Sequence, residues 1–231
     1  MYHSIESMPR STAMRSIHVP PRRFKLQMFL LKILGYKALS IRDLKPYLDG
    51  HKVGKVVGLT FDDGYQNNLI NAAPILNKYD FTATCYLVTE NIGKSNEWDL
   101  HKNITQRPLM NQEEINEWIN LGMDIGAHTK NHVDLTSVSY EDAKMEIEGC
   151  KYQLESLFNK PVADFCYPFG RYNEKISMLV KDSGFYTATS MDRGWVNYGT
   201  NMFQLPRIPI NHHTLPHLFL IKLMTRYEDR R

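Results

Sequence analysis

Thr60-Phe61-Asp62-Asp63-Gly64 follows an apolar run, Val56-Val57-Gly58-Leu59. Two adjacent carboxylates at the end of a buried strand are costly unless a cation or a hydrogen-bond network holds them. Parallel α/β folds place their chemistry at the carboxyl ends of strands, where this Asp pair would lie. Gly64 then allows a sharp turn. The pentapeptide alone is equally compatible with a polar strand-to-helix turn in which an Asp caps the next helix.

A second polar cluster, Gly126-Ala127-His128-Thr129-Lys130-Asn131-His132, follows another short apolar stretch. Histidines four residues apart meet on one face of a helical turn, and neutral imidazole is the commonest metal ligand. Two histidines with one Asp leave a coordination position open, as in catalytic rather than structural zinc sites. The sequence therefore predicts a divalent metal, zinc first and cobalt or nickel as alternatives.

In these two segments the sequence resembles the polysaccharide deacetylase family, the metal-dependent N-deacetylases of acetylated amino sugars. Cys-Tyr-Pro-Phe-Gly-Arg-Tyr-Asn at 166–173 resembles the family's third motif, and Met-Asp-Arg-Gly-Trp at 191–195 its fourth. Met-Tyr-His-Ser-Ile at 1–5 and Leu-Pro-Arg-Ile-Pro-Ile at 205–210 resemble the branch of bacterial poly-N-acetylglucosamine deacetylases. The resemblance runs from residue 1 to about residue 217 and implies a distorted (β/α)7 barrel.

The resemblance also implies roles for individual residues. Asp62 would be the general base, and Asp63, His128 and His132 the metal ligands. A backbone amide near Tyr167 would help to hold the oxyanion. The expected substrate contacts are Tyr167, Pro168, Phe169 and Trp195, although the first three are also compatible with an aromatic core segment.

Two positions depart from the family pattern. Many members carry an Arg at the position of Cys166, where it orients the base, and a thiol lacks that charged fork. We expect Arg207 to replace it, with a surface salt bridge as the alternative. Leu215-Pro216-His217 matches the usual last motif, whose His is the general acid, but it falls late in the chain. The rival candidates for the acid are His212, His213 and His3.

Composition and charge indicate which classes of protein and function are compatible with the chain. A chain of 231 residues, 42% of them hydrophobic, is compatible with a single catalytic domain over residues 1–231. A net charge of +3 is too small to indicate nucleic-acid binding. Three scattered cysteines, Cys85, Cys150 and Cys166, predict buried thiols rather than a disulfide framework.

Strand-like and helix-like patterns alternate along the chain, which predicts βα units and a parallel sheet. Asn111 and Glu114 resemble a capping box that opens a helix. Leu26, Leu30 and Leu34 predict an amphipathic helix whose leucines face the core. Residues 91–107 form a polar loop with Trp98, which we interpret as a surface insertion in preference to a substrate-binding loop.

No segment has the ~20 apolar residues that a bilayer span requires. No secretory leader is evident, so a cytoplasmic location is the expectation for the chain as given. The oligomeric state is left open by the sequence.

The predicted function is that of a metal-dependent hydrolase that removes N-acetyl groups from an amino-sugar glycan or glycoconjugate. Two alternatives remain at this stage. One is an amidohydrolase acting on another small linear or cyclic amide. The other is a catalytically weak carbohydrate-binding protein. The intact Asp62, Asp63, His128 and His132 argue against it, and the missing motif Arg keeps it open.

Overall fold

A computed structural model describes residues 1–102 and 104–230, which contain seven helices with α geometry and seven strands. The helices are α1 (Pro21–Ile33), α2 (Ile41–Leu48), α3 (Ala73–Lys78), α4 (Gln112–Asn120), α5 (Tyr140–Phe158), α6 (Glu174–Asp182) and α7 (Pro216–Met224). The strands are β1 (Lys37–Leu39), β2 (Val56–Gly58), β3 (Thr60–Phe61), β4 (Thr84–Leu87), β5 (Asp124–Ala127), β6 (Asp164–Cys166) and β7 (Thr187–Thr189).

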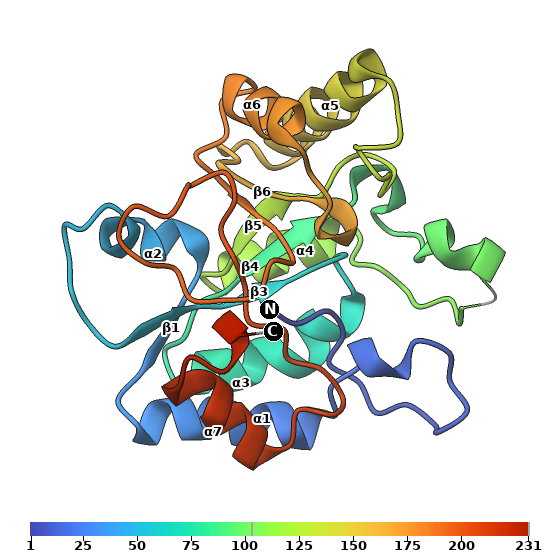
Figure 1. The fold of residues 1–231 in the computed structure, drawn as a ribbon. Coiled ribbons are helices and arrows are strands. Elements are labelled where there is room, and N and C mark those ends of the chain that lie inside the picture. Colours follow the sequence, from blue (N-terminus) through green and yellow to red (C-terminus); the bar gives the residue numbers. More distant parts are fainter. Residues whose placement is uncertain (103, 231) are drawn as a thin grey trace.

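Five strands form one parallel sheet in the order β3-β4-β5-β6-β7, the same order as in the sequence. The register places Phe61 opposite Cys85, Cys85 opposite Ile125, and Phe165 opposite Ala188. Helices α5 and α6 lie on one side of the strands, and α1, α3 and α7 on the other (Figure 1). Because every strand of this sheet points the same way, all the strand-end loops with polar motifs meet at one edge.

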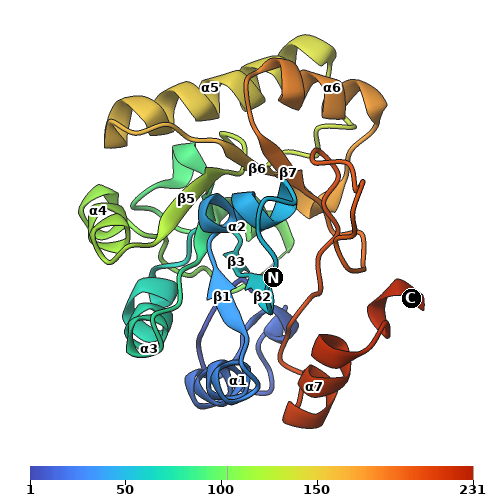
Figure 2. The ribbon, with the colours of Figure 1, turned by 90° about the vertical axis from the view of Figure 1, so that its left-hand side faces the viewer.

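Two irregular segments join the open edges of this sheet into a distorted barrel. Leu205 forms a parallel bridge with Thr189 at the end of β7, and Tyr2 forms one with Phe61 of β3. Between them, the Ile210 amide donates to the Met1 carbonyl over 2.9 Å. The view in Figure 2 shows the helices arranged around the strands. The predicted α/β barrel is therefore confirmed, although the two segments that close it, residues 1–5 and 205–210, are not regular strands.

The two-stranded sheet β1–β2 adjoins the main sheet through β3. β2 pairs in parallel with β1, and a single residue, Leu59, separates β2 from β3. One continuous stretch of chain therefore serves two sheets. A small cluster of Leu39, Ile41 and Leu44 lies at this two-stranded sheet, separate from the main core.

Most predicted elements are present, and the capping box of α4 is confirmed by Asn111 and Glu114 in both directions. The predicted face of α1 is confirmed for Leu30 and Leu34, which are half-buried against the main core, and wrong for Leu26. Leu26 is 40% exposed, and the buried face carries Phe24, Met28 and Leu31. Two apolar rows run along this helix at spacings of three and four residues, and only packing against the barrel chooses between them.

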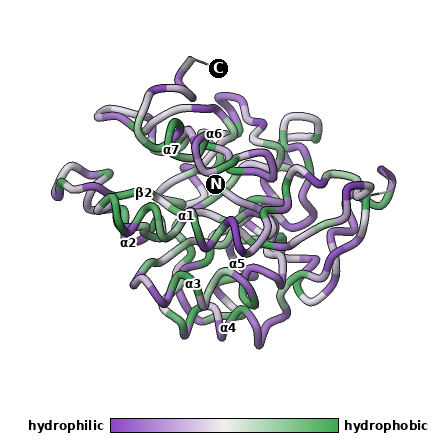
Figure 3. Tube along the Cα trace, turned by 90° about the horizontal axis from the view of Figure 1, so that it is seen from below, coloured by the Kyte–Doolittle hydropathy of each residue, from purple (hydrophilic) through white to green (hydrophobic). Residues whose placement is uncertain are grey.

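The main core cluster draws buried residues from Tyr2 to Leu223 and fills the space between the sheet and its helices. Hydrophilic colouring predominates in many peripheral loops, while the helices alternate between both colours (Figure 3). The three cysteines are buried and unpaired, as predicted. Within the described residues, no helix combines the length and apolar character needed to cross a membrane.

Candidate metal centre and catalytic site

The polar motifs converge because they follow neighbouring strands of the parallel sheet. Asp62 and Asp63 come directly after β3, His128 directly after β5, and Cys166 ends β6. Asp62, Asp63 and His128 are 3%, 6% and 2% exposed, so their charges and lone pairs are almost fully withdrawn from bulk water. Such burial is costly unless each group has a partner.

Asp63, His128 and His132 have the spacing of a ligand set. The Nε2 atoms of His128 and His132 lie 3.5 and 3.4 Å from Oδ1 of Asp63. All three donor atoms lie within 4.8 Å of one another. Two atoms that each lie about 2.1 Å from a tetrahedral zinc ion are about 3.4 Å apart. The three residues therefore fit a divalent cation without rearrangement.

The hydrogen bond at Nδ1 of His128 also suits a metal ligand. Its Nδ1 lies 2.7 Å from the Cys166 carbonyl oxygen, which accepts hydrogen bonds and donates none. Nδ1 must therefore carry the proton in the neutral ring, and the lone pair of Nε2 faces Asp63. Backbone carbonyls often fix metal-binding histidines in this manner. Cys166 thus contributes its main chain to the centre.

The reason given for the histidine pair from sequence is wrong. Residues 128–132 are not helical, since Thr129 and His132 have φ angles of 65° and 55°. The imidazoles meet at a centroid distance of 4.9 Å because a tight loop reverses the chain. Thr129 Oγ1 accepts the backbone N–H of His132 over 3.0 Å and closes this loop.

Glu146 of α5 holds the same loop from outside. Its Oε2 accepts the amides of Lys130 and Asn131 over 2.8 and 2.9 Å, and Oε1 accepts Asn131 Nδ2 over 2.7 Å. Sequence reasoning missed this residue. The only available signal was an acidic residue beside the buried stripe of a helix, which is usually solvated.

Backbone strain is concentrated at this centre. Outside glycine, the described residues with positive φ include Asp63 (74°), Thr129 (65°), His132 (55°) and Phe169 (58°). Such conformations cost about 1–3 kcal/mol each and persist where surrounding structure enforces them. Four of them around one cluster indicate that these side chains are held in place at the expense of stability.

Asp62 is held by Arg207. The guanidinium donates from Nη1 to Oδ1 over 2.7 Å and from Nη2 to Oδ2 over 2.8 Å, a bidentate arrangement. Arg207 also donates to Cys166 Sγ over 3.2 Å and, through Nε, to the Ser190 carbonyl over 2.8 Å. The contact expected between Arg207 and Asp62 is thus present, and Arg207 is 7% exposed rather than on the surface.

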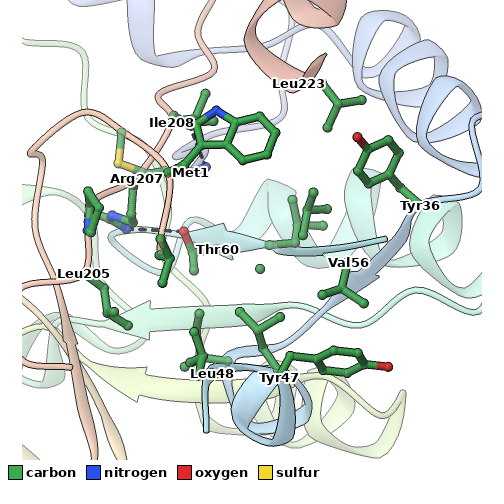
Figure 4. Close-up of a pocket in the computed structure, with 18 of the residues that line it drawn as sticks. Met1, Tyr36, Tyr47, Leu48, Val56, Thr60, Leu205, Arg207, Ile208 and Leu223 are labelled. Carbon is green, nitrogen blue, oxygen red and sulfur yellow. Dashed lines mark hydrogen bonds between the residues drawn. The ribbon is translucent and has the colours of Figure 1, made fainter. Parts of the chain in front are cut away.

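The chain brings Arg207 to this position along the edge of β7. The Arg207 amide donates to the Asp192 carbonyl over 2.8 Å, next to the Leu205 bridge. Beyond the guanidinium lies an apolar cavity of about 550 Å³. Figure 4 shows Arg207 and its hydrogen bond to Thr60 at one end, with Tyr36 and Tyr47 toward the other. Arg207 thus separates Asp62 from this cavity.

The electrostatics keep both carboxylates charged. Burial alone would raise the pKa of Asp62, but Arg207 outweighs it, and the net pKa lies below the usual value. The pKa of Asp63 is likewise held well below its usual value despite burial, because the two neighbouring imidazoles offset the cost of burying its charge. Burial lowers the pKa of His132, which favours the neutral imidazole that a metal requires.

Of the four expected substrate contacts, the structure brings only Phe169 to this centre. Its ring is 41% exposed and lies edge-on to His132 at a centroid distance of 4.6 Å. Tyr167 and Pro168 are buried, and the Tyr167 hydroxyl donates to the Phe203 carbonyl over 2.9 Å. The Tyr167 amide donates to Thr189 in the sheet, so it is not directed at a substrate.

Trp195 lies elsewhere. Its indole N–H donates to the Thr225 carbonyl over 3.2 Å, and the residue lines the cavity beyond Arg207. The fourth motif therefore approaches the centre through its backbone contact with Arg207 and not through its aromatic ring.

Among the four histidines considered for the general acid, His3 is the one that lies beside Asp62. Its Nε2 lies 4.0 Å from Asp62 Oδ2, with a side chain 20% exposed. His217 is exposed on the first turn of α7, a helix that packs against α1. His212 and His213 contact each other, and the His212 amide donates to the Ser16 carbonyl. The literal motif match at His217 thus lies apart from the Asp62 cluster.

A family model described as polysaccharide deacetylase matches residues 49–188, more than half of the chain. The chain belongs to the polysaccharide deacetylase family. Membership implies deacetylation of acetylated glycans, and the matched range contains Asp62, Asp63, His128 and His132. Arg207 and His3 lie outside it, so their placement rests on the structure of this family member alone.

Relatives agree over nearly the whole chain. YxkH of Bacillus subtilis is 28% identical over 213 residues, which cover 91% of this chain and 70% of YxkH. The poly-β-1,6-N-acetyl-D-glucosamine N-deacetylase of Staphylococcus epidermidis is 25% identical, covering 90% and 73%. The Streptococcus pyogenes deacetylase PplD, solved with acetate, has a TM-score of 0.83 and 27% identity, covering 96% and 95%.

Proposed function

We propose that this family member hydrolyses the acetamide of an N-acetylated amino-sugar glycan, with a divalent ion, zinc first, held by Asp63, His128 and His132. The observation that carries the proposal is the pairing of two differently held carboxylates. Asp62 is clamped by Arg207, and the adjacent Asp63 faces two imidazoles. One carboxylate is thereby available as a base while the other serves as a ligand.

The bound ion would polarise the acetyl carbonyl and lower the pKa of a coordinated water. Asp62 accepts the proton that the water loses, and its low pKa keeps it ionised near neutral pH. Arg207 fixes the plane of this carboxylate through two parallel hydrogen bonds, so that it is oriented before the substrate arrives.

His3 is the proposed donor of the proton that the departing amine requires. It lies in the irregular segment 1–5, which pairs with β3, and its Nε2 is 4.0 Å from Oδ2 of Asp62. A group at this distance and still partly exposed can reach both the site and solvent. His217 retains the sequence match but lacks this position. A His3→Gln variant should therefore lose far more turnover than a His217→Gln variant.

The decisive experiment measures acetate release from defined β-linked N-acetylglucosamine oligosaccharides. The activity should disappear on chelation, return on addition of zinc, and be lost in Asp62→Asn. Asp80→Asn, which changes an exposed aspartate in the turn after α3, is the matched control. Ring-opening hydrolysis of small cyclic amides, with no acetate released from glycans, would replace the proposal with the alternative of an amidohydrolase. Glycan binding without any release would indicate a carbohydrate-binding protein.

A further inference from the structure

Trp98 lies directly on the candidate metal centre, although the sequence suggested a surface loop. Its ring stacks on the His132 imidazole at a centroid distance of 4.6 Å and an interplanar angle of 24°. Trp98 is half-buried, so part of the indole stays accessible. The side chain comes from a 3₁₀ turn, Glu97–Lys102, within the polar loop whose residue 103 lies outside the described residues.

The base of this loop is hydrogen-bonded to both catalytic motifs. The Glu90 amide donates to the Lys130 carbonyl over 2.9 Å, beside the histidine loop. On the return, the Met110 amide donates to the Gly64 carbonyl over 2.9 Å, in the Asp-Asp-Gly turn. The two limbs pair with each other through Leu109 and Lys94. Trp98 is thus carried by a loop anchored to the site on both sides.

Phe169 stands on another side of the same imidazole, edge-on at 4.6 Å. Phe169 has a φ of 58°, and the next residue, Gly170, is packed so closely that a Cβ there would come within 2.3 Å of Met191. Lys102 of the Trp98 turn has its Nζ 5.3 Å from the centre of the Phe169 ring and pairs with Asp99 over 3.1 Å. The two aromatic residues therefore form connected walls around His132.

We propose that Trp98 and Phe169 form the subsite that binds the pyranose ring carrying the acetamide, with Trp98 as the residue that makes the site selective for sugars. The inference rests on the proposed function. A β-linked hexosamine ring presents a flat face of axial C–H groups, which an indole binds well, since it offers a large rigid apolar surface. A small acetyl compound has no such face and gains nothing from Trp98.

The alternative role for Trp98 is support of His132 alone, and two substrates separate the two roles. The probes are N-acetylglucosamine tetrasaccharide and vinyl acetate, an acetyl ester without a ring, compared in the wild type, Trp98→Ala and Trp98→Phe. Stacking predicts that the glycan-to-ester ratio of kcat/KM falls about tenfold in Trp98→Ala, mainly through KM, and recovers partly in Trp98→Phe. Tyr152→Ala, an aromatic 76% exposed on α5, is the control.

Binding is measured independently of turnover. Titration calorimetry of the tetrasaccharide with Asp62→Asn and with Asp62→Asn/Trp98→Ala should show about tenfold weaker binding in the second protein, at equal bound metal. A fall in bound metal, or an equal loss on both substrates, overturns the inference in favour of support for His132. An active wild type with an unchanged Trp98→Ala ratio overturns this inference alone, whereas a wild type inert on every glycan overturns the proposed function as well.

Discussion

Replacing Arg207 with Lys keeps the positive charge and removes the planar fork, so it isolates the value of orienting Asp62. Lys can keep one carboxylate contact of the two that Arg207 makes at 2.7 and 2.8 Å, and it loses the Nε contact with Ser190. A hydrogen bond to a charged group contributes about 1.5–3 kcal/mol. If that orientation is used in the transition state, kcat should fall about 10- to 150-fold.

The assay is single-substrate turnover of an N-acetylglucosamine oligosaccharide, with metal content and thermal unfolding measured on the same samples. Bound metal should not change, because the guanidinium contacts Asp62 and not the ligand set. The melting temperature should fall by about 3–12 °C, since the same bonds stabilise the fold. Arg171→Lys, which changes an exposed arginine paired with Asp134, is the matched control.

The pH dependence of kcat is a second test of the contact between Arg207 and Asp62. Arg207 lowers the pKa of Asp62, so with Asp62 as the proposed base, activity should be lost only when the pH falls below that lowered value. Arg207→Ala removes the cation and should move the acidic limb of the kcat profile to higher pH. Turnover within twofold of the wild type in Arg207→Lys, with metal and fold intact, would refute the orienting role and leave Arg207 as a structural ion pair.

Three further results are expected. His128→Ala should lose most of its bound metal by elemental analysis, and full occupancy would contradict the ligand assignment. Asp62→Asn should keep the metal and lose about 10²–10⁴-fold in kcat, whereas Asp63→Asn should weaken metal binding; reversed effects would mean that the two roles are exchanged. Asp164, 2% exposed and accepting a hydrogen bond from Thr187, has a pKa raised to about 6 by burial. Its charged form therefore lowers the free energy of unfolding, which should fall as the pH rises from about 4 to about 6. In denaturant unfolding, Asp164→Asn should raise the free energy of unfolding by roughly 1–3 kcal/mol at pH 7.5 and by much less at pH 4.5. An equal rise at both pH values would show that the charge of Asp164 is not the cause.

The sequence by itself determined the class of fold, and it predicted a metal centre. Strand and helix periods are local properties, so alternating βα units were readable without any tertiary information. The Asp pair at 62–63 and the histidines at 128 and 132 each follow an apolar strand, and parallel strands must end at one edge. The residue types then pointed to a metal before any distance was known.

Tertiary structure decided which other residues reach that centre. Arg207 and Asp62 are 145 positions apart, and they meet because two irregular segments, residues 205–210 and 1–5, close the barrel. Such irregular segments have no hydrophobic periodicity from which their position could be predicted. The same closure places His3 beside Asp62, while the motif match at His217 falls on an exposed helix turn.

The aromatic residues show most clearly which contacts the sequence could not predict. Trp195 matched a family motif but lines a separate cavity, whereas Trp98 in a polar loop stacks on His132. The helical spacing of His128 and His132 suggested their proximity for the wrong reason, since a loop with positive φ angles brings them together. Residue type and spacing are local, but a loop's path depends on the backbone hydrogen bonds it makes to distant segments, and those exist only once the barrel has formed.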